Sequence, residues 1–311
     1  MSTVVGAAER PQRSAARRRR RRRKEWLLAA AFLAPSLLLL AVFVVWPAVW
    51  AVRISFTNYT LTGADALNHR WVGLDNYRNL LSDNEFTASL LRTGWFVLAS
   101  AIVGQFILGL GAALALARRD IRFRGAFGAA IVLPLAVPET VAALSWVSML
   151  APDRLGTLNR VLDVADLGPV RWIVAHALLS IIIVNIWRGI AFAAVLFGGA
   201  LEAVPEPVME AARVDGAGPF RTFWLITLPL IRHAVVLYML MTTIGTVTLF
   251  GLVFFLTQGG PGSDTTLASI YIYLTSFKFF EFGVGAAAST LLLAFVFPLG
   301  VLYVRLLRAQ V

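Results

Sequence analysis

The sequence predicts an all-α membrane protein with six transmembrane helices, and three observations support this fold class. Of the 311 residues, 59% are hydrophobic and only 14% are charged, with a mean hydropathy of +0.76. A soluble domain averages about 45–50% apolar and about 25% charged residues. The apolar residues also form long runs, and a dense basic segment precedes the first run. Lipid must therefore be the solvent for much of the surface.

The basic segment, residues 1–25, is expected to be a disordered cytoplasmic tail. It holds ten of the 28 lysines and arginines, including the run from Arg17 to Arg23 and Lys24. The positive-inside bias and anionic lipid hold such a flank at the cytoplasmic face. We do not interpret it as a cleaved signal peptide, because no small-residue cleavage site follows the apolar run. A nucleic-acid-binding arm is the alternative interpretation.

Six apolar segments are long enough to cross a membrane, which takes about 20 residues for about 30 Å of hydrocarbon. The third segment is interrupted by Pro134, Pro138 and Glu139, and the fourth contains Arg188. The second, fifth and sixth carry no charge. Within a transmembrane domain of residues 26–311, the predicted spans cover residues 26–52, 94–117, 127–150, 172–201, 234–257 and 283–304.

The distribution of lysine and arginine predicts that both termini lie in the cytoplasm (N-in/C-in). With the N-terminus inside, cytoplasmic segments hold nineteen of these residues, outer segments hold eight, and Arg188 lies within a span. The short segment 117–124, with four arginines, supports this orientation independently of the tail. The long outer segments are then 53–91 and 258–282, and the long cytoplasmic segment is 202–233.

The cytoplasmic segment 202–233 predicts two short helices with a turn between them. Pro207 suits the first turn of a helix, where its missing N–H is not needed. That helix would cover Val208–Asp215 and stop at Gly216. Pro219 would open a second helix, which Pro229 would close near the membrane.

The first of these helices has the composition of a docking surface. Ala211 and Ala212 are small and let another surface come close, with Glu210, Arg213 and Asp215 as charged edges. A short helix of this kind can insert into a groove of a partner. The alternative is an amphipathic interfacial helix that packs on the spans of its own chain.

The same segment carries a motif at fixed spacing. Glu210-Ala211-Ala212 is followed after three residues by Gly216, and after nine more by Ile226, with Leu228-Pro229 one residue further. This pattern resembles the EAA loop of bacterial binding-protein-dependent ABC importer permeases, where the loop is the coupling helix that docks on the ATP-hydrolysing subunit. The resemblance implies ATPase-coupling contacts at Glu210, Ala211, Ala212, Asp215, Gly216, Ile226 and Pro229.

Other segments resemble the carbohydrate-uptake branch of this family of inner-membrane components. At Leu91-Arg92-Thr93 the family usually has Asn before the Thr, so Arg92 departs from the pattern and weakens inferences about the outer end of the second span. The matching segments are Trp71–Tyr77, Trp187-Arg188-Gly189 with Phe192, Leu201–Pro205, and Thr257–Pro261 with Tyr271-Ile272-Tyr273 and Phe277.

This resemblance implies a function and a set of partners. The chain would be the permease subunit of an ATP-driven importer in the bacterial inner (plasma) membrane, translocating a sugar or related polyol. The implied partners are two ATP-binding subunits, a second and homologous permease subunit, an extracytoplasmic solute-binding protein and membrane lipid, without nucleic acid.

The chain is not expected to be an enzyme by itself. A P-loop needs a lysine after a glycine-rich turn, and the only lysines are Lys24, after seven arginines, and Lys278, after Phe277. ATP and Mg are therefore expected on a separate subunit, with no cofactor bound by this chain. The chain has no cysteine, and His69, His176 and His233 show no metal-ligand spacing, so no metal site is predicted.

Polar residues within the spans are candidates for a translocation path, because such residues are costly in hydrocarbon. Arg188 lies about one helical turn after Asn185, and Glu139 follows Pro138, where broken backbone is tolerated if it lines a cavity. In the alternative, Arg188 and Glu139 pair with each other or with a second permease. The predicted path residues are Asn185, Arg188, Glu139, Gln105, Thr243 and Thr246.

Two rival functions belong to other classes. One is a self-contained carrier driven by an ion gradient, with Glu139 as its proton site. The other is a membrane-anchored nucleic-acid-binding or scaffold protein that uses the arginine tail. Dependence of uptake on a partner ATPase separates the importer from the carrier.

Overall fold

The computed structural model describes residues 10–118 and 122–308, and the chain divides into two units, residues 1–54 and 55–311. The first unit is a continuous helix made of α1 (Arg10–Leu40), a π-helical turn η1 (Ala41–Val45) and α2 (Trp46–Ile54). Its apolar part, Lys24–Ile54, is 31 residues long. Residues 10–25 continue this helix, whereas the expected disordered tail, residues 1–25, begins outside the described residues and stays a prediction. Arginine, alanine and lysine are strong helix formers, which favours such a continuation.

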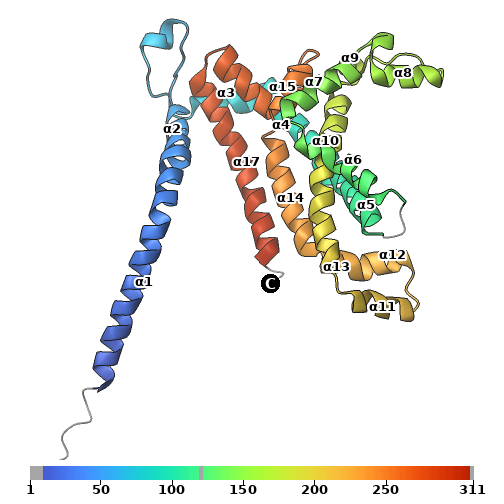
Figure 1. Cartoon of the computed structure of the whole chain (residues 1–311). Helices are drawn as coiled ribbons and strands as arrows, with labels where there is room; N and C mark the ends of the chain where they lie inside the picture. Colours follow the sequence, from blue (N-terminus) through green and yellow to red (C-terminus); the bar gives the residue numbers. More distant parts are fainter. Residues whose placement is uncertain (1–9, 119–121, 309–311) are drawn as a thin grey trace, which may run out of the picture. The chain divides into compact units, whose positions relative to one another are not determined.

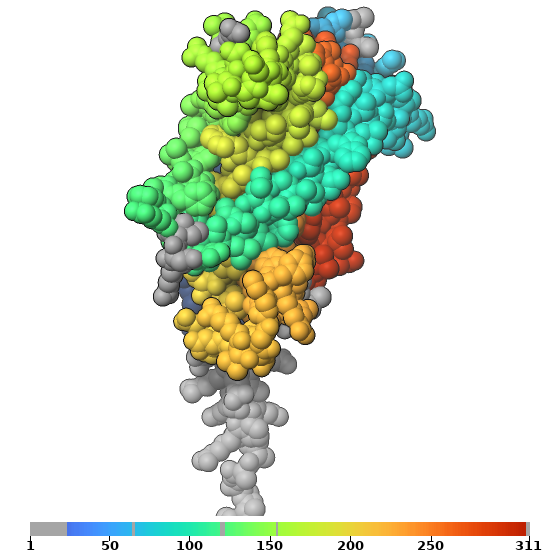
Figure 2. Space-filling view, turned by 90° about the vertical axis from the view of Figure 1, so that its right-hand side faces the viewer, coloured from blue at the N-terminus to red at the C-terminus, as the bar shows by residue number. Residues whose placement is uncertain are grey.

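The second unit is a bundle of long helices (Figure 1). In Figure 1, α14 runs beside α17 and α10, and contacts join these helices. Figure 2 shows the continuous α4–η3–α5 helix crossing one face of the bundle. The long elements are α4 (Asn84–Phe96), η3 (Val97–Gln105), α5 (Phe106–Ala117), α6 (Arg124–Ala136), α7 (Glu139–Met149), α10 (Ala177–Glu202), α14 (Arg232–Val247) and α17 (Phe282–Arg308).

Short helices lie at the two opposite ends of this bundle. In Figure 1, α3, α8, α9 and α15 lie at one end and α11 and α12 at the other, and Figure 2 agrees. The first group, with its neighbours, comprises η2 (Ala64–Leu67), α3 (Asp75–Ser82), η4 (Asp153–Leu155), α8 (Thr157–Val164), α9 (Trp172–Ala175), α15 (Gly251–Thr257), α16 (Ala268–Tyr273) and η6 (Leu274–Lys278). The second group comprises α11 (Glu206–Val214), α12 (Pro219–Thr222), η5 (Phe223–Thr227) and α13 (Leu228–Leu230).

Four helices are long and apolar enough to cross a membrane: Lys24–Ile54, Asn84–Ala117, Ala177–Glu202 and Phe282–Arg308. Two further pairs of helices are bent, by 110° between α6 and α7 and by 70° between Pro219–Leu230 and α14. The count is six if each bent pair is one span. The described residues contain no strand, only an isolated antiparallel bridge between Thr57 and Trp71.

Two predicted spans are interrupted rather than continuous. The third breaks at Val137, which is extended (φ −83°, ψ 123°), because the residue before a proline is pushed out of the α region. The fifth breaks after Val247, where α14 ends, and resumes at Gly251. The hydroxyl of Thr248 turns back there to donate to the carbonyls of the preceding turn, at 3.1 and 3.3 Å. Such bonds compete with the helix pattern.

Small residues let α5 and α10 approach closely. A Cβ on Gly109 would lie 2.2 Å from the Cβ of Ala193, and one on Gly104, in the preceding η3, would lie 2.3 Å from Ile186 Cδ1. Small residues at helix interfaces allow such packing in membranes, where van der Waals contact replaces the hydrophobic effect. Beside this interface, Phe197 and Tyr238 pack in one buried cluster. This core fixes the positions of the polar side chains described below.

Candidate functional site

The EAA segment, residues 210–229, begins in a helix with a satisfied C-terminal end. The N–H of Ala217 donates to the carbonyl of Ala212 at 2.9 Å. The N–H of Gly216 donates to the carbonyl of Arg213 at 3.1 Å. This pair of bonds is a Schellman motif, which places a left-handed residue just after the helix. Gly216 has φ +73°, a conformation that glycine adopts without a steric cost.

The predicted coupling residues divide between the packed and the exposed side of this segment. Ala212 is buried, and Thr227 Oγ1 lies 4.0 Å from Met209 Sδ, so the two short helices pack on each other. Ile226 is half-buried. Glu210, Ala211, Asp215, Gly216 and Pro229 are exposed. The structure therefore presents the acidic and small residues of the motif at the surface, while their role in coupling stays a prediction.

An apolar patch accompanies these exposed residues. Val214 is 86% exposed, and Phe220 and Leu225 are also exposed. They lie in the short helices at the end of the bundle (Figures 1 and 2). Exposed apolar side chains next to charged ones are typical of a surface that contacts a protein or a membrane.

Gln105 and Asn185, predicted for a translocation path, belong to a buried polar network between helices. Gln105 Nε2 donates to the carbonyl of Asn185 at 2.9 Å. Gln105 Oε1 accepts hydrogen bonds from Thr242 (2.9 Å) and Tyr238 (3.3 Å). Asn185 Nδ2 donates to Ser100 Oγ at 2.8 Å. The network joins η3, α10 and α14 and satisfies both amides inside the bundle; that they line a path stays a prediction.

Arg188 and Glu139 form a loose ion pair between α10 and α7. Arg188 Nη1 lies 3.7 Å from Glu139 Oε2, with the two side chains 32% and 30% exposed. Glu139 Oε1 accepts a hydrogen bond from the N–H of Leu252 at 2.6 Å. Arg188 Nε is buried and has no hydrogen-bond partner among the described residues. The structure thus brings the two predicted residues together, as the pairing alternative expected.

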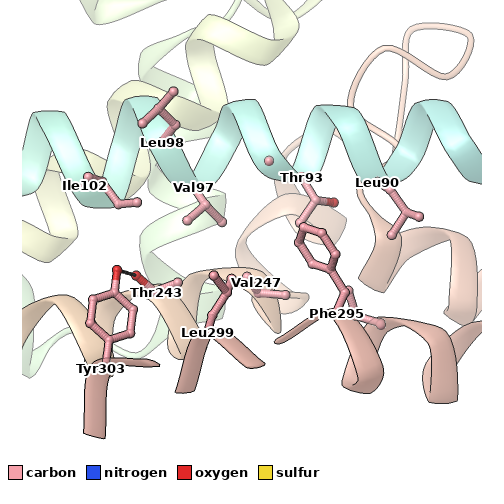
Figure 3. Close-up of a pocket in the computed structure, with 12 residues that line it drawn as sticks. Leu90, Thr93, Val97, Leu98, Ile102, Thr243, Val247, Phe295, Leu299 and Tyr303 are labelled. Carbon is pink, nitrogen blue, oxygen red and sulfur yellow. Dashed lines mark hydrogen bonds between the residues drawn. The ribbon is translucent and has the colours of Figure 1, made fainter. Parts of the chain in front are cut away.

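Thr243 lies in an apolar groove between α4–η3, α14 and α17 (Figure 3). The groove encloses about 200 Å³, and Val247 and Phe295 are among its lining residues. The hydroxyls of Thr243 and Tyr303 are 3.4 Å apart. Thr246 is buried on the same helix. Because solute sites place several polar groups in a pocket, this groove offers little to a sugar hydroxyl.

The motif at residues 71–77, in the predicted first outer segment, fastens the segment after residue 54 to the bundle. Asn76 Nδ2 donates to the carbonyls of Ser55 and Thr57, each at 2.8 Å. The N–H of Gly283 donates to the carbonyl of Tyr59 at 2.8 Å. A Cβ on Gly283 would lie 2.1 Å from the carbonyl oxygen of Thr57, so glycine is needed for this approach. The motif fixes the loop beside the beginnings of α3 and α17.

Arg92, the residue that departs from the family pattern, ties α4 to the segment 258–282, the second of the predicted outer segments. Its guanidinium donates to Glu85 Oε1 at 2.7 Å and to Ser263 Oγ at 3.3 Å. The neighbouring Thr93 Oγ1 accepts from the N–H of Ala268 at 2.8 Å. The segment around α16 is therefore held from α4 at two adjacent positions.

Tyr271, in the family motif of the segment 258–282, contacts the residue that caps α4. Asp83 Oδ1 accepts from the N–H of Glu85 at 2.8 Å, and Asp83 Oδ2 accepts from the Tyr271 hydroxyl at 2.6 Å. Burial and the Asp83 carboxylate raise the pKa of Tyr271 above its ordinary value. The phenol therefore stays protonated and keeps donating to Asp83.

The comparison with protein families identifies the chain. Residues 105–310 match the model of a family described as the binding-protein-dependent transport system inner membrane component. The chain belongs to this family. It is 31% identical to the trehalose/maltose transport system permease protein of Thermococcus litoralis, over 88% of this chain and 91% of the relative. It is 29% identical to the sulfoquinovosyl glycerol transport system permease protein of Agrobacterium fabrum, over 89% of each.

A solved structure has the same fold as this member of the family. The match, in a bacterial ABC transporter that imports the acidic polysaccharide alginate, has a TM-score of 0.77 at 20% identity, covering 94% of this chain and 99% of the other. The predicted family and the predicted all-α membrane fold are confirmed.

Several residues that build the site of this family member were not found from the sequence. Ser100, Tyr238 and Thr242 complete the network of Gln105, and Leu252 and Gly251 contact Glu139. The one local signal was the spacing of Tyr238 and Thr242, which places both on one face of a helix. The other contacts join residues that are far apart in the chain.

Proposed function

We propose that this chain is the membrane-embedded permease subunit of an ATP-driven ABC importer. It would translocate a sugar or a related polyol that an extracytoplasmic binding protein delivers. The observation that carries the proposal is the EAA segment, a capped and exposed helix at one end of the bundle. Family membership supports the permease role. The sugar class is supported by the two relatives named for trehalose/maltose and sulfoquinovosyl glycerol transport.

In this proposal the chain crosses the bacterial inner membrane six times, with both termini in the cytoplasm. The bent pair α6 and α7 is then the third span, and α14 followed by α15 is the fifth. The distribution of lysine and arginine supports the orientation. The EAA segment follows the fourth span in the cytoplasm, and the segments 53–91 and 258–282 face the binding protein.

The chain would couple to ATP hydrolysis without being an enzyme by itself. Two separate subunits would bind ATP and Mg, and a second, homologous permease would supply the other half of the path. Closure of the ATP-binding subunits would push on α11, where Ala211 allows close approach and Glu210 and Asp215 supply negative charge. Gly216 maintains the turn, while Ile226 and Pro229 belong to the second helix of the pair. The spans would then alternate between inward-open and outward-open states.

Among the predicted path residues, Arg188 has the strongest support. Its side chain is 32% exposed and its Nε has no partner among the described residues. A charged group in a span is costly in hydrocarbon, so its exposed part needs water, solute or a partner subunit. We place Arg188 at the path, with Glu139 beside it. Asn185, Gln105, Thr243 and Thr246 would support the helices that form the path wall.

Uptake into proteoliposomes tests this function. The chain is reconstituted with its co-purified ATPase and second permease, with the binding protein outside and labelled trehalose, maltose or sulfoquinovosyl glycerol as probes. We expect uptake of one of these probes to require internal ATP and the binding protein, and to persist when an uncoupler is added. Uptake that proceeds without ATP and stops with the uncoupler would favour the ion-driven carrier instead.

A further inference from the structure

We propose that Glu139 is a positioning residue for transport, whose carboxylate holds the beginnings of α7 and α15 together and keeps Arg188 beside them. The inference rests on the proposed function, because it concerns how the spans move during transport.

Glu139 lies at a break between two helices. It is the first residue of α7, directly after the bend at Val137 and Pro138. Its Oε1 accepts from the N–H of Leu252, which lies at the beginning of α15, directly after the interruption at residues 248–250. One carboxylate therefore joins the two places where the predicted third and fifth spans are broken.

The backbone around Gly251 leaves room for this carboxylate. A Cβ on Gly251 would lie 2.8 Å from Glu139 Oε1 and 3.3 Å from its Cδ. Cβ atoms do not approach other atoms so closely, since this is inside van der Waals contact. The Glu139 carboxylate thus needs glycine at position 251, because a larger residue would push the carboxylate away from Leu252.

The two contacts of the Glu139 carboxylate differ in strength. The bond to Leu252 is 2.6 Å long, whereas the Arg188 nitrogen is 3.7 Å away, beyond hydrogen-bond distance. Hydrogen bonds to an ionised acceptor are stronger than neutral ones, and broken helix ends in a membrane need partners for their free N–H groups. The bond to Leu252 is therefore the principal link, and Arg188 is a weaker third member.

The consequence for transport concerns the two breaks. A helix bend is a natural hinge, and two bends joined by one short hydrogen bond cannot move independently while that bond lasts. The bends of the third and fifth spans would shift as one unit, with Arg188 carried along. When the solute-loaded binding protein docks outside, the resulting movement of the helices would be transmitted to the ATPase subunits through these linked spans.

The test measures ATP hydrolysis by the whole transporter in nanodiscs, with and without its binding protein. Glu139→Leu removes the acceptor, Gly251→Ala displaces it with both charges retained, and Glu139→Gln keeps an acceptor but loses the charge. Gly198→Ala is the matched control, because a Cβ there meets nothing within 4 Å. The readout is the ratio of stimulated to basal hydrolysis, together with the yield of the complex.

We expect the ratio to fall about tenfold in Glu139→Leu and Gly251→Ala, as loss of a hydrogen bond to a charged group implies, with the yield of the complex retained. The ratio should fall much less in Glu139→Gln and should not change in Gly198→Ala. Unchanged ratios in Glu139→Leu and Gly251→Ala, or a parallel loss of yield and both rates, would overturn the inference alone. A wild-type complex without stimulated hydrolysis would overturn the proposed function and the inference with it.

Discussion

At the scale of single residues, Gln105 illustrates how a polar side chain is accommodated within an apolar bundle. Its amide donates to one backbone carbonyl and accepts from two hydroxyls, all from other helices. Burying an amide costs free energy unless it is hydrogen-bonded. The sequence predicted Gln105 and Asn185 to be functionally important, but the two hydroxyl partners lie more than 130 residues away from Gln105 in the chain. Local patterns do not contain that pairing.

Gly189→Ala tests the Gln105 network. The new Cβ would lie 2.0 Å from Gln105 Cδ, so the amide must leave its buried partners. We expect the free energy of unfolding to fall by about 1–3 kcal/mol, the cost of unsatisfied buried polar groups. The measurement is the unfolding temperature in detergent, which should be lower than that of wild type.

Gly111→Ala is the matched control, because a Cβ there meets nothing within 4 Å. Alanine is the better helix former by up to about 1 kcal/mol, so this variant should be neutral or slightly stabilised. Equal unfolding temperatures for the two variants would contradict the described role of Gln105.

At the scale of elements, short sequence patterns predicted the turns and helix ends that depend on residues close together in the chain. The turn at Gly216 and the opening of the second helix at Pro219 were expected from the sequence and are present. Pro138 marked the break of the third span. The break of the fifth span at residues 248–250 was missed, since no proline marks it. The side chain that accepts a hydrogen bond from the N–H of Leu252 after this break, Glu139, is 113 residues away in the chain.

Gly216→Ala tests the Schellman turn of the EAA segment. A residue with a Cβ in the left-handed region costs about 1–2 kcal/mol, so the end of α11 should open more often. We expect faster hydrogen exchange at the amides of residues 216 and 217. Gly218→Ala is the control, because Gly218 has φ −67° and open space for a Cβ. Similar exchange in both variants would show that the left-handed turn does not hold this helix end.

At the scale of the whole molecule, composition predicted the fold class, because an apolar surplus of this size excludes a soluble domain. The lengths of the helices were predicted less well than the fold class. The predicted second span of residues 94–117 is part of a continuous helix, Asn84–Ala117, of 34 residues. At 1.5 Å per residue this helix exceeds the hydrocarbon thickness. Its extra turns are held by contacts of Arg92 and Thr93 with the second outer segment, which the hydropathy pattern does not contain.

Labelling of single cysteines tests the proposed orientation, and the absence of native cysteines makes the test clean. Leu67 is 99% exposed in the first outer segment and Val214 is 86% exposed in the EAA segment. In intact spheroplasts a membrane-impermeant maleimide should label Leu67→Cys and spare Val214→Cys. In inverted vesicles the result should be the opposite. Labelling of both variants from the same side would contradict the proposed topology.

Co-purification in mild detergent tests the central claim, that the EAA segment docks this permease on an ATPase, most directly. Wild type is compared with Glu210→Lys, which reverses an exposed charge, and with Gly216→Pro, which cannot adopt φ +73°. Glu281→Lys, an exposed reversal in the outer segment, is the control. We predict that an ATPase and a second permease accompany wild type and the control, and that only the ATPase is lost from the two EAA variants. A wild-type chain that purifies alone, or an ATPase retained equally by all four proteins, would contradict the claim.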